Sequence, residues 1–146
     1  MQYGSTHESR LSQQARLTDG NKNNVYGGAT WRDGQGNVYE VTGRSDKAGH
    51  TEQHLMDEMR RQVADRLGIP RDRVDLSQMT DVKLFVEYSP CDTAPRWCQQ
   101  DLADVLPQAQ VSYSWPWNPR DVRDQSRRDF ATAITTLFQR GSTGEI

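Results

Sequence analysis

The sequence predicts an α/β sandwich, in which helices pack on a central sheet, and three observations support this class. Segments with the period of strands and of helices follow one another in the order β-β-α-β-α-β-α. Each long helical segment carries a single apolar face. The 146 residues have the length of one domain that can bury a core without disulfides.

The first two strands form a predicted hairpin. The segment VYGGATW, Val25–Trp31, contains a glycine pair, which indicates close approach of another backbone or of a ligand. Asp33-Gly34 is typical of a hairpin turn. The segment Asn37–Gly43 then alternates apolar and polar residues, as a half-buried strand does.

The first long helix is predicted for Thr51–Leu67, and Gly68 and Pro70 end it. Its apolar side chains recur at every fourth residue, with Met56 beside them: Leu55, Met59, Val63 and Leu67. The segment VKLFVEY, Val82–Tyr88, has the strongest strand pattern of the chain.

The remaining elements complete the alternation. A second helix begins near Cys98 and stops at Pro107, and residues 109–115, AQVSYSW, form another strand. Asn118 and Pro119 then open a third helix as its N-cap and first residue, and Gly141 closes it. The apolar face of this last helix contains Phe130, Ala133, Ile134, Leu137 and Phe138.

The domain organisation follows from these elements. Residues 1–23 are a polar lead-in with one short helix at Ser9–Leu17, residues 24–140 form the domain, and residues 141–146 are a tail. The net charge of −2 gives no overall basic signal, so a nucleic-acid partner needs a local patch. No segment has the apolar length of a membrane span or of a signal peptide. We expect a monomeric soluble domain, cut from a longer protein.

Four residues suggest a catalytic zinc site. Cys91 follows the strand Val82–Tyr88, Cys98 begins a helix, and His50 precedes the helix Thr51–Leu67. If the two helices pack side by side, one imidazole and two thiolates converge and leave the fourth position of a tetrahedral zinc open for water. Glu52 is too close to His50 to be an easy second ligand, but it can carry a proton above the open position.

These residues also carry a resemblance to a known family. The sequence HTE at residues 50–52, followed by PC at 90–91 and by Cys98, resembles the H-x-E…P-C…C motif of zinc-dependent cytidine deaminases. The stretch YSPC at 88–91 resembles the S-W-S-P-C of the AID/APOBEC group. The layout YGGATW…DGQGN…GHTEQHLM resembles the deaminases of bacterial polymorphic toxins. The fold of this family is a three-layer sandwich with a central mixed sheet, here of four to five strands.

The resemblance implies hydrolytic deamination of cytosine to uracil in nucleic acid, with DNA, and above all single-stranded DNA, as substrate. Zinc would be held by His50, Cys91 and Cys98, and Glu52 would move protons. The base pocket would be lined by Tyr88, Ser89, Pro90, Gly28 and Ala29. The family further implies a domain of a secreted or delivered bacterial toxin that acts in the cytoplasm of its target cell, with a cognate immunity protein as an expected partner.

The chain departs from the family pattern at two places. Six residues separate Cys91 from Cys98, where the usual gap is two, so the loop between them has to bulge outward to return Cys98 to the metal. No fifth strand follows the last helix. We expect either a four-stranded sheet or one strand without a clear pattern.

Other interpretations of these residues remain open. Cys91 and Cys98 also suit a disulfide, which would make a stapled binding module without catalysis, as would a structural zinc. His54 lies one turn after His50, and the two form a rival zinc pair. His7, in the lead-in, is most simply a surface residue. RNA and free nucleosides or nucleotides are the alternative substrates.

The tryptophans of SYSWPWNP have two interpretations. Alternation places Trp115 and Trp117 on the same side of a strand end, either as core residues or as platforms on which bases stack. Arg120 and Arg123 follow directly. With the nearby arginines they form either a salt-bridged helix surface or contacts to phosphates.

Overall fold

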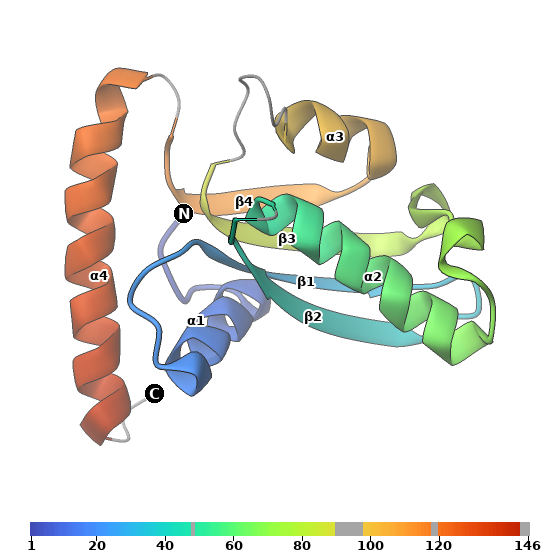
Figure 1. Cartoon of the computed structure of the whole chain (residues 1–146), viewed down its shortest axis with the longest axis horizontal. Coiled ribbons are helices and arrows are strands. Elements are labelled where there is room, and N and C mark those ends of the chain that lie inside the picture. The colour runs from blue at the N-terminus through green and yellow to red at the C-terminus, as the bar shows by residue number, and fades with distance from the viewer. Residues whose placement is uncertain (48, 90–97, 118–119, 144–146) are drawn as a thin grey trace.

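A four-stranded mixed sheet forms the centre of the protein, with strand order β2-β1-β3-β4 (Figure 1). The computed structural model describes residues 1–47, 49–89, 98–117 and 120–143. Strand β1 (Tyr26–Arg32) is antiparallel to β2 (Val38–Arg44) and to β3 (Thr80–Tyr88), and β3 is parallel to β4 (Gln110–Trp115). The predicted mixed sheet of four strands is therefore confirmed.

Helices cover both faces of this sheet, which makes the predicted three-layer sandwich. Helix α2 (Thr51–Leu67) and helix α3 (Cys98–Val105) lie on one face, and α1 (His7–Asp19) lies on the other (Figure 1). Helix α4 (Arg123–Thr143) stands beside α1 at one end of the sheet. The described residues also form three short 3₁₀ turns, at Arg71–Arg73 (η1), Leu76–Gln78 (η2) and Arg120–Val122 (η3).

The core lies between the sheet and α2, as the apolar pattern of Thr51–Leu67 predicts. Leu55, Met59 and Val63 are almost fully buried, and they pack against alternate side chains of the strands. The helix begins and ends at the predicted residues. Gly68 has φ +67°, a left-handed conformation that glycine adopts at little cost, and this terminates the helix.

The glycine pair of β1 is explained by close approach of two other backbones, that of the neighbouring strand β3 and that of α1. A Cβ on Gly27 would lie 2.6 Å from the carbonyl oxygen of Phe85, and one on Gly28 would lie 2.5 Å from that of Glu8 in α1. Real side chains do not tolerate such distances, so both positions require glycine. Of the two causes that the sequence suggested for this pair, a nearby backbone is the one that the structure supports.

Helix α1 packs on the sheet through a polar surface. The helix predicted for Ser9–Leu17 is present and slightly longer, and Thr6 caps it by accepting a hydrogen bond from the Ser9 N–H at 3.1 Å. Its most buried residues include Ser9, Ser12 and Arg16, rather than an apolar stripe. The domain boundaries predicted from the sequence stay a prediction.

The last helix differs from its prediction at both ends. Helix α4 continues through Gly141 to Thr143, because a glycine near a helix end costs only about 1 kcal/mol and does not by itself stop the helix. Asn118 and Pro119, the predicted start, lie outside the described residues, and η3 precedes α4. In the part of the chain that the structure describes, no helix has the length and apolarity needed to cross a membrane.

Candidate active site

A cavity of about 360 Å³ lies at one end of the sheet, where β1 and α2 begin and where β3 and β4 end. Five of the residues predicted for the site line it together, namely His50, Glu52, Tyr88, Ser89 and Trp117. No motif in the sequence indicates the other lining residues, which are Val25, Ser45, Asp46 and Thr51. The volume is within the range of about 300–1,000 Å³ that is usual for small-molecule sites.

The start of α2 is fixed by hydrogen bonds to its surroundings. The Thr51 hydroxyl donates to the carbonyl oxygen of Val25 at 2.7 Å, which ties the first turn of the helix to the start of β1. The His50 N–H donates to the side-chain oxygen of Gln53 at 3.0 Å. These bonds hold His50 and Glu52 at the cavity, with Glu52 only 5% exposed. A carboxylate in the first turn of a helix is also favoured by the helix dipole.

The loop before α2 is held by Asp46. Its carboxylate accepts a hydrogen bond from the Gly49 N–H at 3.0 Å, and Oδ1 lies 2.8 Å from Nε2 of His54. His54 is therefore oriented toward Asp46, and it does not line the cavity. This arrangement favours His50 over the rival pair of His50 with His54.

The end of β3 supplies Tyr88 and Ser89. The ring of Tyr88 packs against the rings of Trp117 and Phe130, with centroids 4.9 and 5.1 Å away. Burial raises the pKa of Tyr88 to about 12, so its hydroxyl keeps its proton at neutral pH and remains a hydrogen-bond donor. The Ser89 hydroxyl accepts a hydrogen bond from the Trp117 N–H at 2.7 Å, and the Ser89 N–H donates to the Trp115 carbonyl at 3.0 Å.

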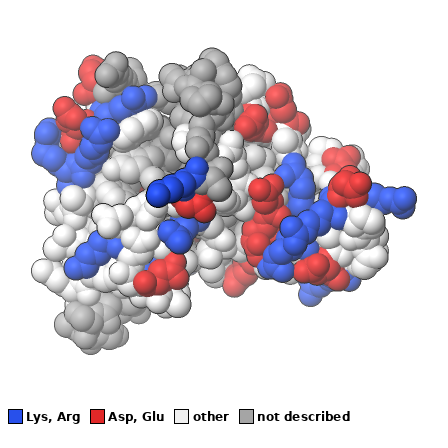
Figure 2. Space-filling model, viewed as in Figure 1, with Lys and Arg blue, Asp and Glu red and all other residues white. Residues whose placement is uncertain are grey.

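Trp117 forms one wall of the cavity, and two arginines pack against its ring. The guanidinium carbons of Arg123 and Arg127 lie 4.8 and 5.0 Å from the centre of its ring, within cation–π range. The Nε of Arg123 also donates to the Trp117 carbonyl at 2.8 Å. Figure 2 shows basic side chains over the first turns of α4, at the upper left of the view, with acidic side chains among them. Arg127 also lies 3.4 Å from the Asp124 carboxylate, so this surface is at least partly the salt-bridged helix surface that the sequence allows.

A family model described as Xanthomonas-like deaminase matches residues 22–133. The chain belongs to this deaminase family. The match extends from the residues before β1 into α4, so it includes every residue that lines the cavity. The protein is therefore a hydrolytic deaminase, an enzyme that uses water to replace an amino group by oxygen and releases ammonia. A search among curated proteins and another among solved structures gave no match.

The two tryptophans of the deaminase have different surroundings, although the ring of Tyr88 lies near both, with centroids 6.3 Å from Trp115 and 4.9 Å from Trp117. Trp115 is 9% exposed, and its ring centroid lies 4.9 Å from that of Tyr3 and 5.2 Å from that of Phe130. It does not line the cavity, so it packs as a core residue. Strand β4 ends at Trp115, and the proline at 116 follows, so the strand alternation does not extend to Trp117.

Gly28 and Ala29 do not line the cavity of the deaminase either, and we correct the expectation that they form its floor. Gly28 faces α1 on the opposite side of the sheet, and Ala29 is fully buried in the core beneath α2. The hairpin pattern gives the alternation of these residues but not the position of the strand relative to the site. His7 is half exposed on α1, where Nε2 lies 2.8 Å from a carboxylate oxygen of Glu40.

The cysteines of the deaminase lie at the limits of what the structure describes. Pro90 and Cys91 are outside the described residues, and the backbone of Cys98 begins α3, on the same face of the sheet as α2. Among the described residues, no three His, Cys, Asp or Glu side chains are grouped so that they could hold a metal ion. The ligand set predicted from the sequence depends on both cysteines, so it stays a prediction. The side chain of Arg123 lies against Trp117, whereas the side chain of Arg120 is outside the described part.

Proposed function

We propose that the deaminase converts cytosine to uracil in nucleic acid, with single-stranded DNA as the favoured substrate and zinc as its cofactor. The observation that carries this proposal is the presence of His50 and Glu52 in one cavity with Tyr88 and Trp117. An imidazole and a buried carboxylate at a helix start are the groups that hydrolytic deamination needs. An aromatic wall with arginines beside it suits a base within a polyanionic strand.

The zinc ligands would be His50, Cys91 and Cys98. The donor set fits a catalytic zinc because it combines one nitrogen with two thiolates and leaves a fourth position for water. The described residues are compatible with this set, since His50 lines the cavity and Cys91 follows Ser89 by only two residues in the sequence. When bound, zinc supplies Lewis-acid activation of a water molecule.

Glu52 has the role of moving protons in this mechanism. Its carboxylate takes a proton from the attacking water as the water oxygen bonds to C4 of the base, and it delivers that proton to N3. It then transfers the second proton of the water to the amino nitrogen, which leaves as ammonia when the bond to C4 breaks. A position inside the cavity, with 5% exposure, keeps bulk water from competing for these protons.

The walls of the cavity would hold the base. Tyr88 and Trp117 offer aromatic surfaces, and the Ser89 hydroxyl fixes the backbone of Trp117 by accepting its N–H. A cavity of about 360 Å³ has room for one base, and a single strand is favoured because its base enters without unpairing. Arg123 and Arg127 would contact the phosphates next to that base.

The biological setting that we propose rests on the resemblance of the layout YGGATW…DGQGN…GHTEQHLM to polymorphic-toxin deaminases. In that setting, the domain is delivered by a bacterial toxin into the cytoplasm of a target cell, and a cognate immunity protein restrains it. Deamination of single-stranded DNA would then introduce uracil at sites that are transiently unpaired.

The decisive experiment supplies the purified protein with four substrates in parallel: single-stranded DNA, duplex DNA, RNA and free cytidine. We expect uracil in single-stranded DNA first, together with about one zinc per chain by elemental analysis. If uracil forms only in RNA, or if cytidine alone is converted, to uridine, that substrate takes the place of single-stranded DNA in the proposal. Turnover by protein without bound zinc would contradict the proposed cofactor. A disulfide between Cys91 and Cys98, with no turnover of any substrate, would favour the stapled binding module.

A further inference from the structure

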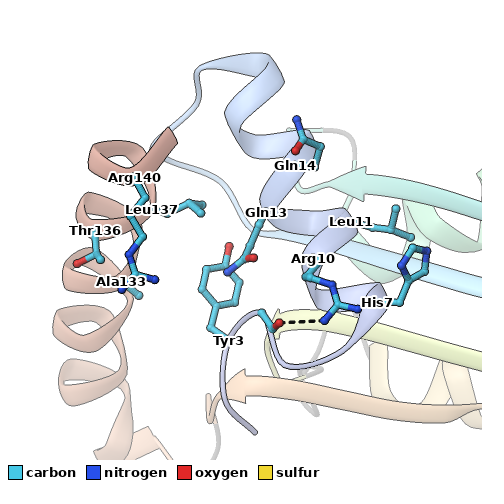
Figure 3. Close-up of a pocket in the computed structure, with 11 residues that line it drawn as sticks. Tyr3, His7, Arg10, Leu11, Gln13, Gln14, Ala133, Thr136, Leu137 and Arg140 are labelled. Carbon is cyan, nitrogen blue, oxygen red and sulfur yellow. Dashed lines mark hydrogen bonds between the residues drawn. The ribbon is translucent and has the colours of Figure 1, made fainter. Parts of the chain in front are cut away.

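The segment before α1 contributes an aromatic side chain to the rings that pack beside the active-site cavity. This residue is Tyr3, which projects between α1 and α4 in Figure 3 and borders a groove of about 650 Å³ between these helices. The family model matches residues 22–133, so the match does not include Tyr3. Tyr3 does not line the active-site cavity. Any effect of Tyr3 on the deaminase therefore has to act through its neighbours.

The backbone around Tyr3 is tied to two elements of the fold. The Gly4 N–H donates to the hydroxyl of Ser9, in the first turn of α1, at 2.7 Å. On the other side of Tyr3, the nitrogen of Met1 donates to the carbonyl of Tyr113 in β4 at 2.8 Å. These bonds direct the Tyr3 side chain into the space between α1, α4 and the end of β4.

The hydroxyl and the ring of Tyr3 have different neighbours. The hydroxyl donates to the buried carboxylate of Glu87. Burial raises the pKa of Tyr3, so the hydroxyl keeps its proton at neutral pH and remains a donor. The ring packs against Trp115 and Phe85, with centroids 4.9 and 6.2 Å away. Removal of the hydroxyl and removal of the ring therefore disturb different contacts.

Trp115 connects the ring of Tyr3 to the wall of the cavity. The centroid of Trp115 lies 5.2 Å from that of Phe130 and 6.3 Å from that of Tyr88, and Tyr88 lies 4.9 Å from Trp117. Tyr88 and Trp117 line the cavity. Protein interiors are densely packed, so the loss of one ring shifts the rings that rest on it. A change at Tyr3 should thus reach the wall through Trp115.

The opposite side of the cavity, which holds Glu52, has a support of its own. The Thr51 hydroxyl donates to the Val25 carbonyl at 2.7 Å, and this bond joins α2 to the residue before β1 rather than to the rings around Trp115. A displaced aromatic wall should therefore weaken the binding of substrate more than it slows the proton transfers at Glu52.

We propose that Tyr3 is a positioning residue of the deaminase: its ring supports Trp115, and Trp115 holds Tyr88 and Trp117 in place as the wall of the cavity. The Tyr3 hydroxyl has the separate role of completing the hydrogen bonds of Glu87. This inference rests on the proposed function in taking the cavity as the active site, but it does not depend on which substrate is turned over.

The test compares Tyr3→Leu, which removes the ring, with Tyr3→Phe, which removes only the hydroxyl. Steady-state kinetics are measured on the substrate that the parent protein turns over. Tyr3→Leu should raise KM by about three- to ten-fold and change kcat less, because part of the contact between the base and the wall is lost. Tyr3→Phe should lower the melting temperature and leave KM near the parent value, because only the bond to Glu87 is removed.

This division between KM and kcat separates positioning from a purely structural role. Partial unfolding lowers the concentration of active enzyme, so it lowers the apparent kcat and leaves KM unchanged. Leu11→Ala is a further control, because Leu11 is on α1 and lies away from Tyr3 in Figure 3. Tyr3→Met is a second variant without the ring, with the same expectation as Tyr3→Leu if the leucine variant does not fold.

A second measurement needs no substrate. The whole protein is labelled with fluorotryptophan, and the fluorine NMR resonance of Trp117 is assigned from Trp117→Phe. We expect Tyr3→Leu to shift this resonance, although Tyr3 is next to Trp115 rather than Trp117, and we expect Tyr3→Phe to leave it near its parent position.

An unchanged KM or an unshifted Trp117 resonance in the variant without the ring would each overturn the proposal. An equal rise of KM in Tyr3→Phe or in Leu11→Ala would also overturn it, because the effect would then not come from the ring. If the parent protein turns over none of the substrates tested, the proposed function fails, whereas the Trp117 resonance still decides whether Tyr3 positions the wall.

Discussion

Two buried glutamates, Glu52 and Glu87, lie on opposite faces of the sheet and illustrate two different uses of a buried carboxylate. Glu52 is at the start of α2 and lines the active-site cavity, and Glu87 is on β3 and faces α1. Both are almost inaccessible to solvent, with 5% and 0% exposure. What separates them is whether the carboxylate borders a space that a substrate can enter.

Glu87 is enclosed by donors. Arg16 binds both of its carboxylate oxygens, the Tyr3 hydroxyl donates to one, and the Tyr26 N–H donates to the other at 2.7 Å. The guanidinium of Arg16 also donates to three backbone carbonyls after α1, those of Asn21, Asn23 and Asn24. Burial raises the pKa of Glu87, and Arg16 opposes this effect. Such a satisfied network fixes α1 on the sheet but leaves no group for chemistry.

The comparison teaches that burial alone does not identify a functional carboxylate. The neighbouring residues Glu87 and Tyr88 point to opposite faces because strand side chains alternate, so β3 contributes to the network and to the cavity at once. Changes at Glu52 should therefore alter catalysis, whereas changes around Glu87 should alter stability. The following predictions separate these two effects.

The largest effect is expected from Glu52→Gln. Removing the proton carrier should lower deamination by roughly 10²–10⁴-fold, while the melting temperature stays close to that of the parent. Turnover of the substrate and thermal unfolding are measured side by side. Glu58→Gln is the matched control, because Glu58 is on the same helix but outside the cavity. A Glu52→Gln enzyme within a few-fold of the parent would remove Glu52 from the mechanism.

The next effect is on stability, through Arg16→Met. The change leaves the Glu87 carboxylate buried without its cation, and breaking such a pair costs about 3–5 kcal/mol in the free energy of unfolding. Urea denaturation measures this cost. Without Arg16, only the hydrogen bonds from Tyr3 and Tyr26 oppose the effect of burial, which raises the pKa of Glu87. The lost stability should therefore grow as the pH rises above the pKa of an unfolded glutamate.

A double variant tests whether the charge is the cause. Arg16→Met combined with Glu87→Leu should be less destabilised than Arg16→Met alone, because no unpaired charge remains. Equal destabilisation of the two proteins at every pH would indicate that Arg16 acts through packing on Tyr26 and Phe130, whose ring centres lie 4.4 and 5.1 Å from its guanidinium carbon.

A smaller effect is expected at Trp117. Trp117→Ala should lower turnover of oligonucleotides by roughly ten- to a hundred-fold and leave any turnover of free cytidine unchanged, because stacking on the strand is lost. Trp115→Leu is the comparison, since this core residue should lower the melting temperature and every activity together. Parallel losses of all activities in Trp117→Ala would place Trp117 in the same class as Trp115.

The smallest effect is expected from Arg127→Glu. Oligonucleotide binding at low salt should weaken about three-fold, because one exposed cation near Trp117 is reversed. The dependence of the binding constant on salt should flatten accordingly. Arg128→Glu, one residue later on α4, should change neither quantity by as much. Identical effects of the two reversals would indicate a diffuse charge effect rather than a contact at the cavity.

Much of the fold could be predicted from the sequence because apolar periodicity determines it. The α2 bounds and the alternation of β2 both follow from the side chains that the core requires. The packing of α1 could not be predicted, because its buried surface is made of serines and Arg16, and a polar helix has no period that distinguishes its buried side. The partner of Arg16 is Glu87, and a glutamate within an apolar strand was the signal from which a buried ion pair could have been predicted.

The site residues that belong to one local motif could be predicted from the sequence, whereas those whose position depends on tertiary structure could not. His50 and Glu52 come to the cavity together because two residues at a helix start move as a unit. Alternation could not predict that Trp117 lines the cavity while Trp115 does not, because the strand ends at Trp115. Gly28 faces away from the cavity because α1 covers that face of β1, and the sequence of the hairpin does not indicate which face α1 covers.

The hydrogen bonds between Ser89 and the segment after β4 have a consequence for the kinetics of folding. They join residues that are far apart in the sequence, with Ser89 accepting from Trp117 and donating to Trp115, and they form only after the parallel pairing of β3 with β4. Parallel pairing across a helical crossover is a slow, non-local step. In a refolding time course, deaminase activity should therefore return with the last structural phase, and helix formation seen by circular dichroism should precede it.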